Sequence, residues 1–74
     1  MTFRKYLKSI EREASPEGDF AEDALRDKSF PWKKANDLKD GKTSILWYLS
    51  RQRACREAVE AFSNVWRDYK RSAS

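Results

Sequence analysis

The chain has 74 residues, of which 38% are charged, and it carries a formal net charge of +4 with no histidine and one cysteine. A chain of this length forms one domain, which we take as residues 1–74, and no apolar run approaches the roughly 18 residues of a membrane span. Histidine is the commonest general base and metal ligand, so its absence leads us to expect no enzymatic activity, no cofactor and no metal site.

The first helix is predicted from an apolar stripe near the start of the chain. Its members recur at the i, i+3, i+4, i+7 spacing of an amphipathic helix: Phe3, Tyr6, Leu7 and Ile10. Thr2 is a suitable N-cap, and the helix should end near Glu13, before the turn-forming residues 15–18. The chain enters this pattern directly, so we expect no signal peptide, and with a single cysteine we expect a reducing cytoplasm.

A second helix is predicted after that turn. Asp19 is its expected N-cap, and Glu22 three residues later completes a pair resembling a capping box. The helix should stop at Phe30-Pro31, because a proline disfavours helical geometry at the residue before it. Four residues form its buried face: Phe20, Ala21, Ala24 and Leu25.

Residues 32–42 are predicted to form a loop that can hold one helical turn around residues 35–39. A short helix should follow, capped by Thr43 or Ser44 and ending at Leu49. Ser50 is then the expected cap of the longest helix, which runs to about Arg71. The inward positions of that helix lie within about 120° of arc: Cys55, Ala58, Val59, Phe62, Val65, Trp66 and Tyr69. Its first member, the lone cysteine, is therefore expected to be buried and unreactive.

No stretch alternates apolar and polar residues over a useful length, so the pattern predicts an all-α fold of four helices, or five with the short turn. An ordered set of residues then resembles a known family: Phe3-x-x-Tyr6-Leu7, Gly18-Asp19-Phe20-Ala21, Asp27-x-x-Phe30-Pro31, Tyr48-Leu49 and Phe62-x-x-x-Trp66-x-x-Tyr69. Over nearly the whole chain this set is similar to the YozE family of small bacterial proteins. The resemblance implies a compact bundle like the sterile alpha motif (SAM), found in bacteria and their mobile elements. It implies no catalytic residues, since the matching positions look like core residues.

The chain departs from that family between Pro31 and Tyr48, where the connection is longer than usual. Loop elaborations on a fixed scaffold commonly carry function. We therefore take four residues of this stretch as the candidate partner surface: Trp32, Lys33, Lys34 and Trp47.

The two tryptophans of this surface each allow two interpretations. Trp47 falls opposite Ile45 and Leu49 on its helix, so either the 32–42 loop covers it or it is exposed for a partner. Trp32 could stack on a nucleobase, or it could plug the bundle behind Pro31.

Positive charge is concentrated in the second half of the chain. Residues 41–56 contain four basic residues and no acidic one, and with Lys33 and Lys34 these are the candidate nucleic-acid contacts: Lys42, Arg51, Arg53 and Arg56. Arg51 and Arg53 are expected in the first turn of the last helix, where a cation opposes the helix dipole unless an anion docks there. The alternative is an ordinary solvated cationic surface.

Paired carboxylates such as Glu57 and Glu60 are expected to form i,i+4 ion pairs with Arg53 and Arg56 rather than a catalytic site. The sequence therefore favours a non-enzymatic cytoplasmic interaction module, with a protein partner ahead of nucleic acid. SAM-like folds commonly mediate protein association, which is an analogy of fold alone. The alternatives are a nucleic-acid-binding protein, with DNA as one candidate, and an inhibitor of a host factor encoded on a mobile element. We expect no membrane contact and no small-molecule substrate, and the sequence leaves the oligomeric state open.

Overall fold

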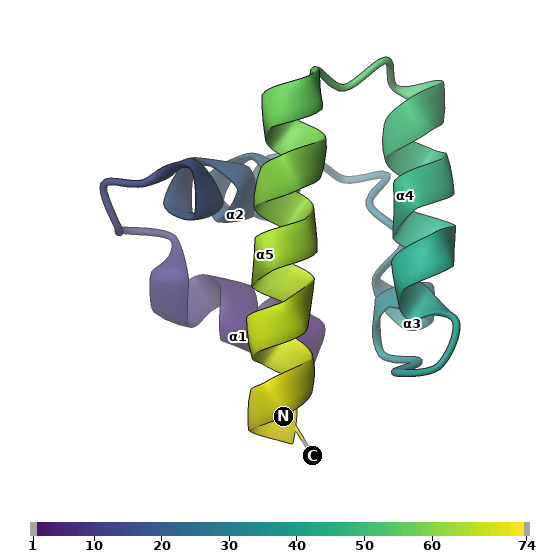
Figure 1. Ribbon diagram of the computed structural model, residues 1–74, viewed down its shortest axis with the longest axis horizontal. Helices are drawn as coiled ribbons and strands as arrows, with labels where there is room; N and C mark the ends of the chain where they lie inside the picture. Colours follow the sequence, from purple (N-terminus) through teal and green to yellow (C-terminus); the bar gives the residue numbers. More distant parts are fainter. Residues whose placement is uncertain (1, 74) are drawn as a thin grey trace.

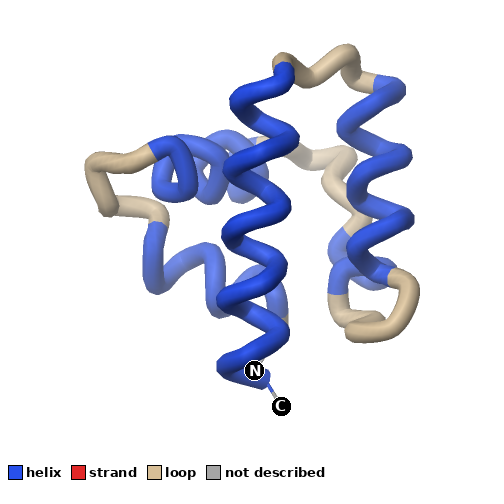
Figure 2. Tube along the Cα trace, in the orientation of Figure 1, coloured by secondary structure: helices blue, strands red, loops and turns tan. Residues whose placement is uncertain are grey.

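The computed structural model describes residues 2–73 and contains five helices and no strand within that range. The helices are α1 (Phe3–Ile10), α2 (Pro16–Arg26), α3 (Trp32–Ala35), α4 (Gly41–Arg51) and α5 (Arg56–Ala73). The all-α prediction is therefore confirmed. A short helical turn is present as α3, at residues 32–35 and not around residues 35–39 as predicted. In Figure 1, α5 occupies the middle of the molecule, with α1 and α2 on one side and α3 and α4 on the other. The connections drawn as loops in Figure 2 are residues 11–15, 27–31, 36–40 and 52–55.

The start of α1 follows the sequence closely. Thr2 has an extended backbone, and its hydroxyl accepts a hydrogen bond from the backbone N–H of Lys5 at 3.2 Å, which confirms the predicted N-cap. The helix ends at Ile10, earlier than expected, because the next residues form a turn in which the N–H of Glu13 donates to the Ile10 carbonyl.

The predicted start of α2 is wrong by four residues. Ser15 is the N-cap instead of Asp19, and its hydroxyl accepts from the N–H of Gly18 at 3.1 Å. Pro16 occupies the first helical position, where its missing N–H costs nothing. Gly18 is buried, and a Cβ there would lie 2.1 Å from the carbonyl oxygen of Glu13. The absence of a side chain at residue 18 thus allows the turn to fold back against α2.

The connection expected to be a loop over residues 32–42 is mostly ordered into helices. It contains α3, a turn in which the Asp37 carboxylate accepts from the N–H groups of Lys39 and Asp40, and an early start of α4 at Gly41. A Cβ at Gly41 would lie 2.7 Å from both the Lys34 carbonyl oxygen and the Trp66 ring. The close approach of α3, α4 and α5 therefore depends on this glycine.

The boundary between the last two helices is also displaced from the prediction. α4 continues through Ser50 to Arg51, and α5 begins only at Arg56. The chain turns through a Schellman motif, in which the N–H of Ala54 donates to the Leu49 carbonyl and that of Arg53 to the Ser50 carbonyl. Arg53 takes the left-handed position of this motif with φ 56°, although glycine is usual there.

Phe3 lies at the centre of the aromatic core. Its ring lies 5.1 Å from that of Tyr69, 5.2 Å from Trp66 and 6.3 Å from Phe62, separations at which aromatic pairs attract one another. The core draws buried apolar residues from all five helices: Phe3, Leu7, Phe20, Ala21, Ala24, Phe30, Ala35, Ile45, Leu49, Ala61, Phe62, Val65, Trp66 and Tyr69. Most of the predicted aromatic skeleton is confirmed as core, whereas Tyr6 and Tyr48 are only half-buried.

Candidate binding surfaces

The side chain of Trp47 is 64% exposed, and it is the one large hydrophobic residue so exposed in the part of the chain that the structure describes. α4 turns Ile45 and Leu49 into the core and leaves Trp47 on its outer face. The Arg51 guanidinium, one turn later, lies 4.9 Å from the centroid of the Trp47 ring, in the geometry of a cation–π contact. The interpretation in which the 32–42 loop covers Trp47 is therefore wrong.

Trp32 belongs to the bundle rather than to that exposed face. Its ring lies 4.4 Å from that of Phe30 and 6.4 Å from that of Phe3, and it is half-buried. The Arg4 guanidinium covers it at 5.7 Å. This is the plugging role that the sequence allowed, and it separates Trp32 from Trp47, which has different neighbours.

The predicted nucleic-acid contacts form two groups at opposite ends of α4. Lys33, Lys34 and Lys42 are exposed near its start, where α3 lies (Figure 1). The arginines cluster at its other end, where it passes into α5. Because α4 rises about 1.5 Å per residue, the two groups are separated by about 13 Å along the helix. The fold therefore does not gather them into one patch.

The three arginines occupy different local environments. Arg51 lies in the last turn of α4, where its charge is favourable to the helix dipole, and Arg53 lies in the connection. The prediction that both open the last helix is wrong, since only Arg56 lies in its first turn. Arg56 forms the predicted ion pair with Glu60 at 3.1 Å.

The second predicted ion pair, between Arg53 and Glu57, is absent from the salt bridges among the described residues. Arg53 precedes α5, so the two residues do not share a helical face as the sequence suggested. The carboxylate of Glu57 instead lines a groove.

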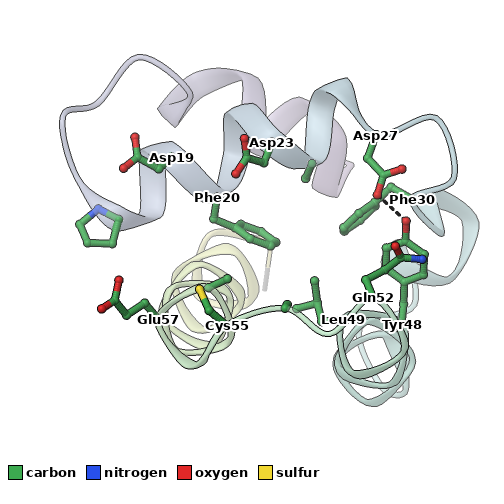
Figure 3. A pocket seen from close by; sticks show the side chains of 14 residues that line it. Asp19, Phe20, Asp23, Asp27, Phe30, Tyr48, Leu49, Gln52, Cys55 and Glu57 are labelled. Atoms are coloured by element: carbon green, nitrogen blue, oxygen red, sulfur yellow. Dashed lines mark hydrogen bonds between the residues drawn. The ribbon is translucent and has the colours of Figure 1, made fainter.

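That groove was not predicted from the sequence. It has a cavity volume of about 460 Å³ and lies where α2 faces the end of α4 and the start of α5. Figure 3 shows the Phe20 ring pointing into it, with Asp19 and Asp23 along the α2 side and Cys55 and Glu57 along the α5 side. We call this site the acidic groove, and its lining residues are Pro16, Asp19, Phe20, Asp23, Ala24, Asp27, Phe30, Tyr48, Leu49, Gln52, Ala54, Cys55, Glu57 and Ala58.

One end of the acidic groove is closed by a hydrogen bond between α4 and the end of α2. The Tyr48 hydroxyl donates to the carboxylate of Asp27 (Figure 3). The other oxygen of that carboxylate accepts from the N–H of Ser29 at 2.9 Å. The hydrogen bond to Asp27, with burial and the charge of that carboxylate adding to it, raises the pKa of Tyr48 to about 12. Tyr48 therefore stays a protonated donor at physiological pH.

Cys55 corrects another sequence prediction. The thiol is exposed and lines the acidic groove, whereas its assignment to the buried face of α5 required the helix to begin at Ser50. Because α5 begins at Arg56, Cys55 precedes the helix and its carbonyl accepts from the N–H of Val59. The helical phase that placed it inward does not apply to it.

The described residues contain no cluster of three or more His, Cys, Asp or Glu able to hold a metal ion. Among them, too, no helix combines the length and apolar character needed to cross a membrane. The acidic row on α2 was visible in the sequence as Asp19, Asp23 and Asp27, at intervals of four. The residues opposite it were not visible, because they come from a helix junction that the sequence misplaced.

Comparison with known proteins gives one match. The family model described as the YozE SAM-like fold matches residues 2–71, nearly the whole chain. No curated protein and no solved structure matches the chain significantly. The family match concerns fold and carries no statement of activity.

Proposed function

We propose that this protein, which belongs to the YozE SAM-like family, is a non-enzymatic module that binds another protein through the outer face of α4. We call that surface the Trp47 face and define it by Trp47 and Arg51. The observation that carries the proposal is the 64% exposure of Trp47 on a helix that buries Ile45 and Leu49 on its opposite face.

An exposed tryptophan is costly for a monomer and favourable for an interface. Trp and Arg are the side chains most enriched at interface hot spots, where truncation costs about 2 kcal/mol or more. Arg51 already lies over the Trp47 ring in the free protein. Binding a partner therefore costs less conformational entropy at Arg51 than ordering a free side chain would. Removal of water on binding would strengthen the cation–π contact from about 0.5–1 kcal/mol toward about 2 kcal/mol.

Two further features support the class of function. The chain has no histidine, and Cys55, the one nucleophilic thiol, lies exposed without a base of that kind, which argues against catalysis. An exposed thiol in a chain with one cysteine also suits a reducing compartment, so we place the protein in the cytoplasm.

Nucleic acid is the second candidate, because an arginine stacked on an exposed tryptophan could also accept an unpaired base. It ranks below protein for two reasons. The basic residues are split between the two ends of α4, and Arg56 is already paired with Glu60. A phosphate backbone that used both groups would have to follow the length of the helix.

The test is capture from the native host by the immobilised protein, with and without nuclease, using wild type, Trp47→Ala and Thr43→Ala. Thr43 is an exposed residue of the same helix and serves as the matched control. We expect wild type and the control to retain the same nuclease-resistant protein. Once that protein is purified, Trp47→Ala should weaken its binding by about 30-fold, the equivalent of about 2 kcal/mol.

Two outcomes would reject this proposal. Loss of the captured material on nuclease treatment would support the nucleic-acid alternative. In that case the log of the affinity should fall with the log of the salt concentration with a slope of roughly −3 to −5. Neutralising Lys33, Lys34 and Lys42, or Arg51, Arg53 and Arg56, should bring this slope toward zero. Equal retention by wild type and Trp47→Ala would show that the Trp47 face is not the site.

A further inference from the structure

The acidic groove has the properties of a second docking site, separate from the Trp47 face. Its floor is apolar, with Phe20 and Phe30 from the α2 side and Leu49 from α4. Its volume of about 460 Å³ lies in the range of about 300–1,000 Å³ typical of ligand sites. The apolar floor alone does not identify an occupant. The charged residues that line the groove indicate which class of molecule it binds.

Those charges are all negative, in a protein whose net charge is +4. Asp19, Asp23, Asp27 and Glu57 line the groove, and no lysine or arginine does so among the described residues. A concave, low-dielectric wall carrying one sign of charge concentrates the opposite sign. The local charge thus has the opposite sign to that of the whole molecule, and it selects for a cationic occupant.

Three of these carboxylates are unpaired. Asp27 is occupied by Tyr48 and Ser29, but within residues 2–73 the carboxylates of Asp19, Asp23 and Glu57 form no ion pair and no side-chain hydrogen bond. Two other carboxylates on the same helices do form i,i+4 ion pairs, Glu22 with Arg26 at 2.8 Å and Glu60 with Arg56 at 3.1 Å. The carboxylates of Asp19, Asp23 and Glu57 are therefore free to pair with basic groups of another molecule.

The spacing of the carboxylates indicates the size of the cation. No group of three or more of them is close enough to hold a metal ion among the described residues. Asp19 and Asp23 instead follow each other by one turn of α2, about 6 Å along its axis. A ligand with two cations one helical turn apart would match the spacing of the Asp19 and Asp23 carboxylates. An apolar side chain between those cations would match the apolar floor of the groove.

From these observations we propose that the acidic groove binds a basic amphipathic helical segment of a partner protein. Lysine or arginine side chains of that segment would pair with Asp19, Asp23 and Glu57, and its apolar side chains would rest on Phe20 and Leu49. A second copy of this chain is a poorer occupant. Among residues 2–73 its one large exposed apolar residue is Trp47, which brings one neighbouring cation, Arg51, for three carboxylates. The proposal does not depend on the Trp47 face, since the two surfaces share no residue.

Cys55 provides a direct measurement of occupancy, because it is the sole cysteine, exposed and part of the groove lining. Arg53 and Arg56 flank it in sequence, but neither lines the groove. The rate of alkylation of Cys55 by neutral iodoacetamide would be measured with synthetic peptides of about 14 residues, or about four helical turns. One peptide carries a leucine stripe and lysines, and two matched peptides replace either the lysines with glutamates or the leucines with serines.

We expect the leucine–lysine peptide to slow the alkylation by about tenfold near saturation, when about nine-tenths of the protein is occupied. The other two peptides should leave the rate unchanged. The variant Asp19→Asn/Asp23→Asn/Glu57→Gln should lose the protection. The matched variant Glu11→Gln/Glu13→Gln/Asp68→Asn removes the same charge outside the groove lining and should retain it. Thermal melts of both variants establish that each is folded.

Four results would overturn the proposal. The first is an alkylation rate that no peptide changes, and the second is equal protection by the leucine–glutamate peptide. The third is an equal loss of protection in the two variants. The fourth is protection that rises with protein concentration alone, which would make a second copy of this chain the occupant. Failure of the Trp47→Ala capture experiment leaves all of these readouts unaffected, so the two surfaces are tested separately.

Discussion

Two regions of this molecule use the same kinds of side chain in opposite ways. Where α1, α3 and the second half of α5 meet, the rings of Phe3, Trp66 and Tyr69 interlock and are almost wholly buried. At the corner where α4 passes into α5, Trp47 and Cys55 are exposed, and Arg53 holds an unfavourable backbone conformation. The first region stabilises the fold. The second leaves apolar and charged groups available, which is why we place the functional surfaces there.

The largest expected effect comes from Trp66→Ala, which tests the buried aromatic region. Trp66 is 3% exposed and touches the rings of Phe3, Phe62 and Tyr69. Trp66→Ala should lose about 3–5 kcal/mol of unfolding free energy, close to the whole stability of a small domain. We expect the variant to be largely unfolded at physiological temperature by circular dichroism. Trp47→Ala is the control and should melt near wild type; equal losses from the two tryptophans would remove the contrast.

Gly41 tests whether the buried region depends on close backbone approach. A Cβ at this position would lie 2.7 Å from the Lys34 carbonyl oxygen, and backbone cannot rotate away as a side chain can. Gly41→Ala should therefore destabilise the protein by about 1–3 kcal/mol in urea unfolding, in spite of the better helix propensity of alanine. Lys42→Ala, in the same turn and exposed, should change stability little. A Gly41→Ala protein as stable as wild type would mean that α3 can shift without cost.

The hydrogen bond from Tyr48 to Asp27 links the two regions and should show itself at alkaline pH. Because the pKa of Tyr48 is raised from 10.0 to about 12, its contribution to stability is complete below pH 10 and is lost as the pH rises through 12. Burial also raises the pKa of Tyr6 and Tyr69, so wild type should lose stability over this range for more than one reason.

Tyr48→Phe isolates the contribution of that hydrogen bond. The variant should be less stable than wild type near neutral pH by about 1 kcal/mol, the usual net value of a hydrogen bond. The difference between the two proteins should then shrink as the pH approaches 12, because wild type loses the bond when Tyr48 ionises. Urea unfolding at several pH values measures this, and a difference that is constant with pH would mean that the bond does not form.

The smallest effect is a gain at the exposed corner. Arg53 lies at φ 56°, where a side chain costs about 1 kcal/mol and glycine costs none. Arg53→Gly should stabilise the protein by about 0.5–1 kcal/mol, since the added freedom of glycine in the unfolded chain offsets part of the gain. Arg53→Ala removes the same charge, keeps the strain and should show no gain. If both variants were equally stabilised, charge repulsion at the corner would be the cause and not the backbone.

Much of the buried region could be predicted from the sequence, because it depends on patterns that are local in the chain. The i, i+3, i+4, i+7 stripe that includes Phe3 and Leu7 sets the inward face of α1, and Thr2 caps that helix whatever surrounds it. Phe62, Val65, Trp66 and Tyr69 repeat along α5 in the same way and are buried as predicted. Helical periodicity determines which face is apolar, and in so short a chain that face has few elements to pack against.

The tertiary structure alone decided the exposed corner and the acidic groove. A Schellman turn without its usual glycine leaves no sequence signal, so Ser50 was predicted as a cap although it lies inside α4. That displacement moved Cys55 out of α5 and brought Glu57 opposite Asp19 and Asp23. Which side chains face each other across a groove depends on where helices end and how they pack. The ends of the helices and their packing depend on the free energy of the whole fold, so they cannot be derived from the sequence pattern of any one segment.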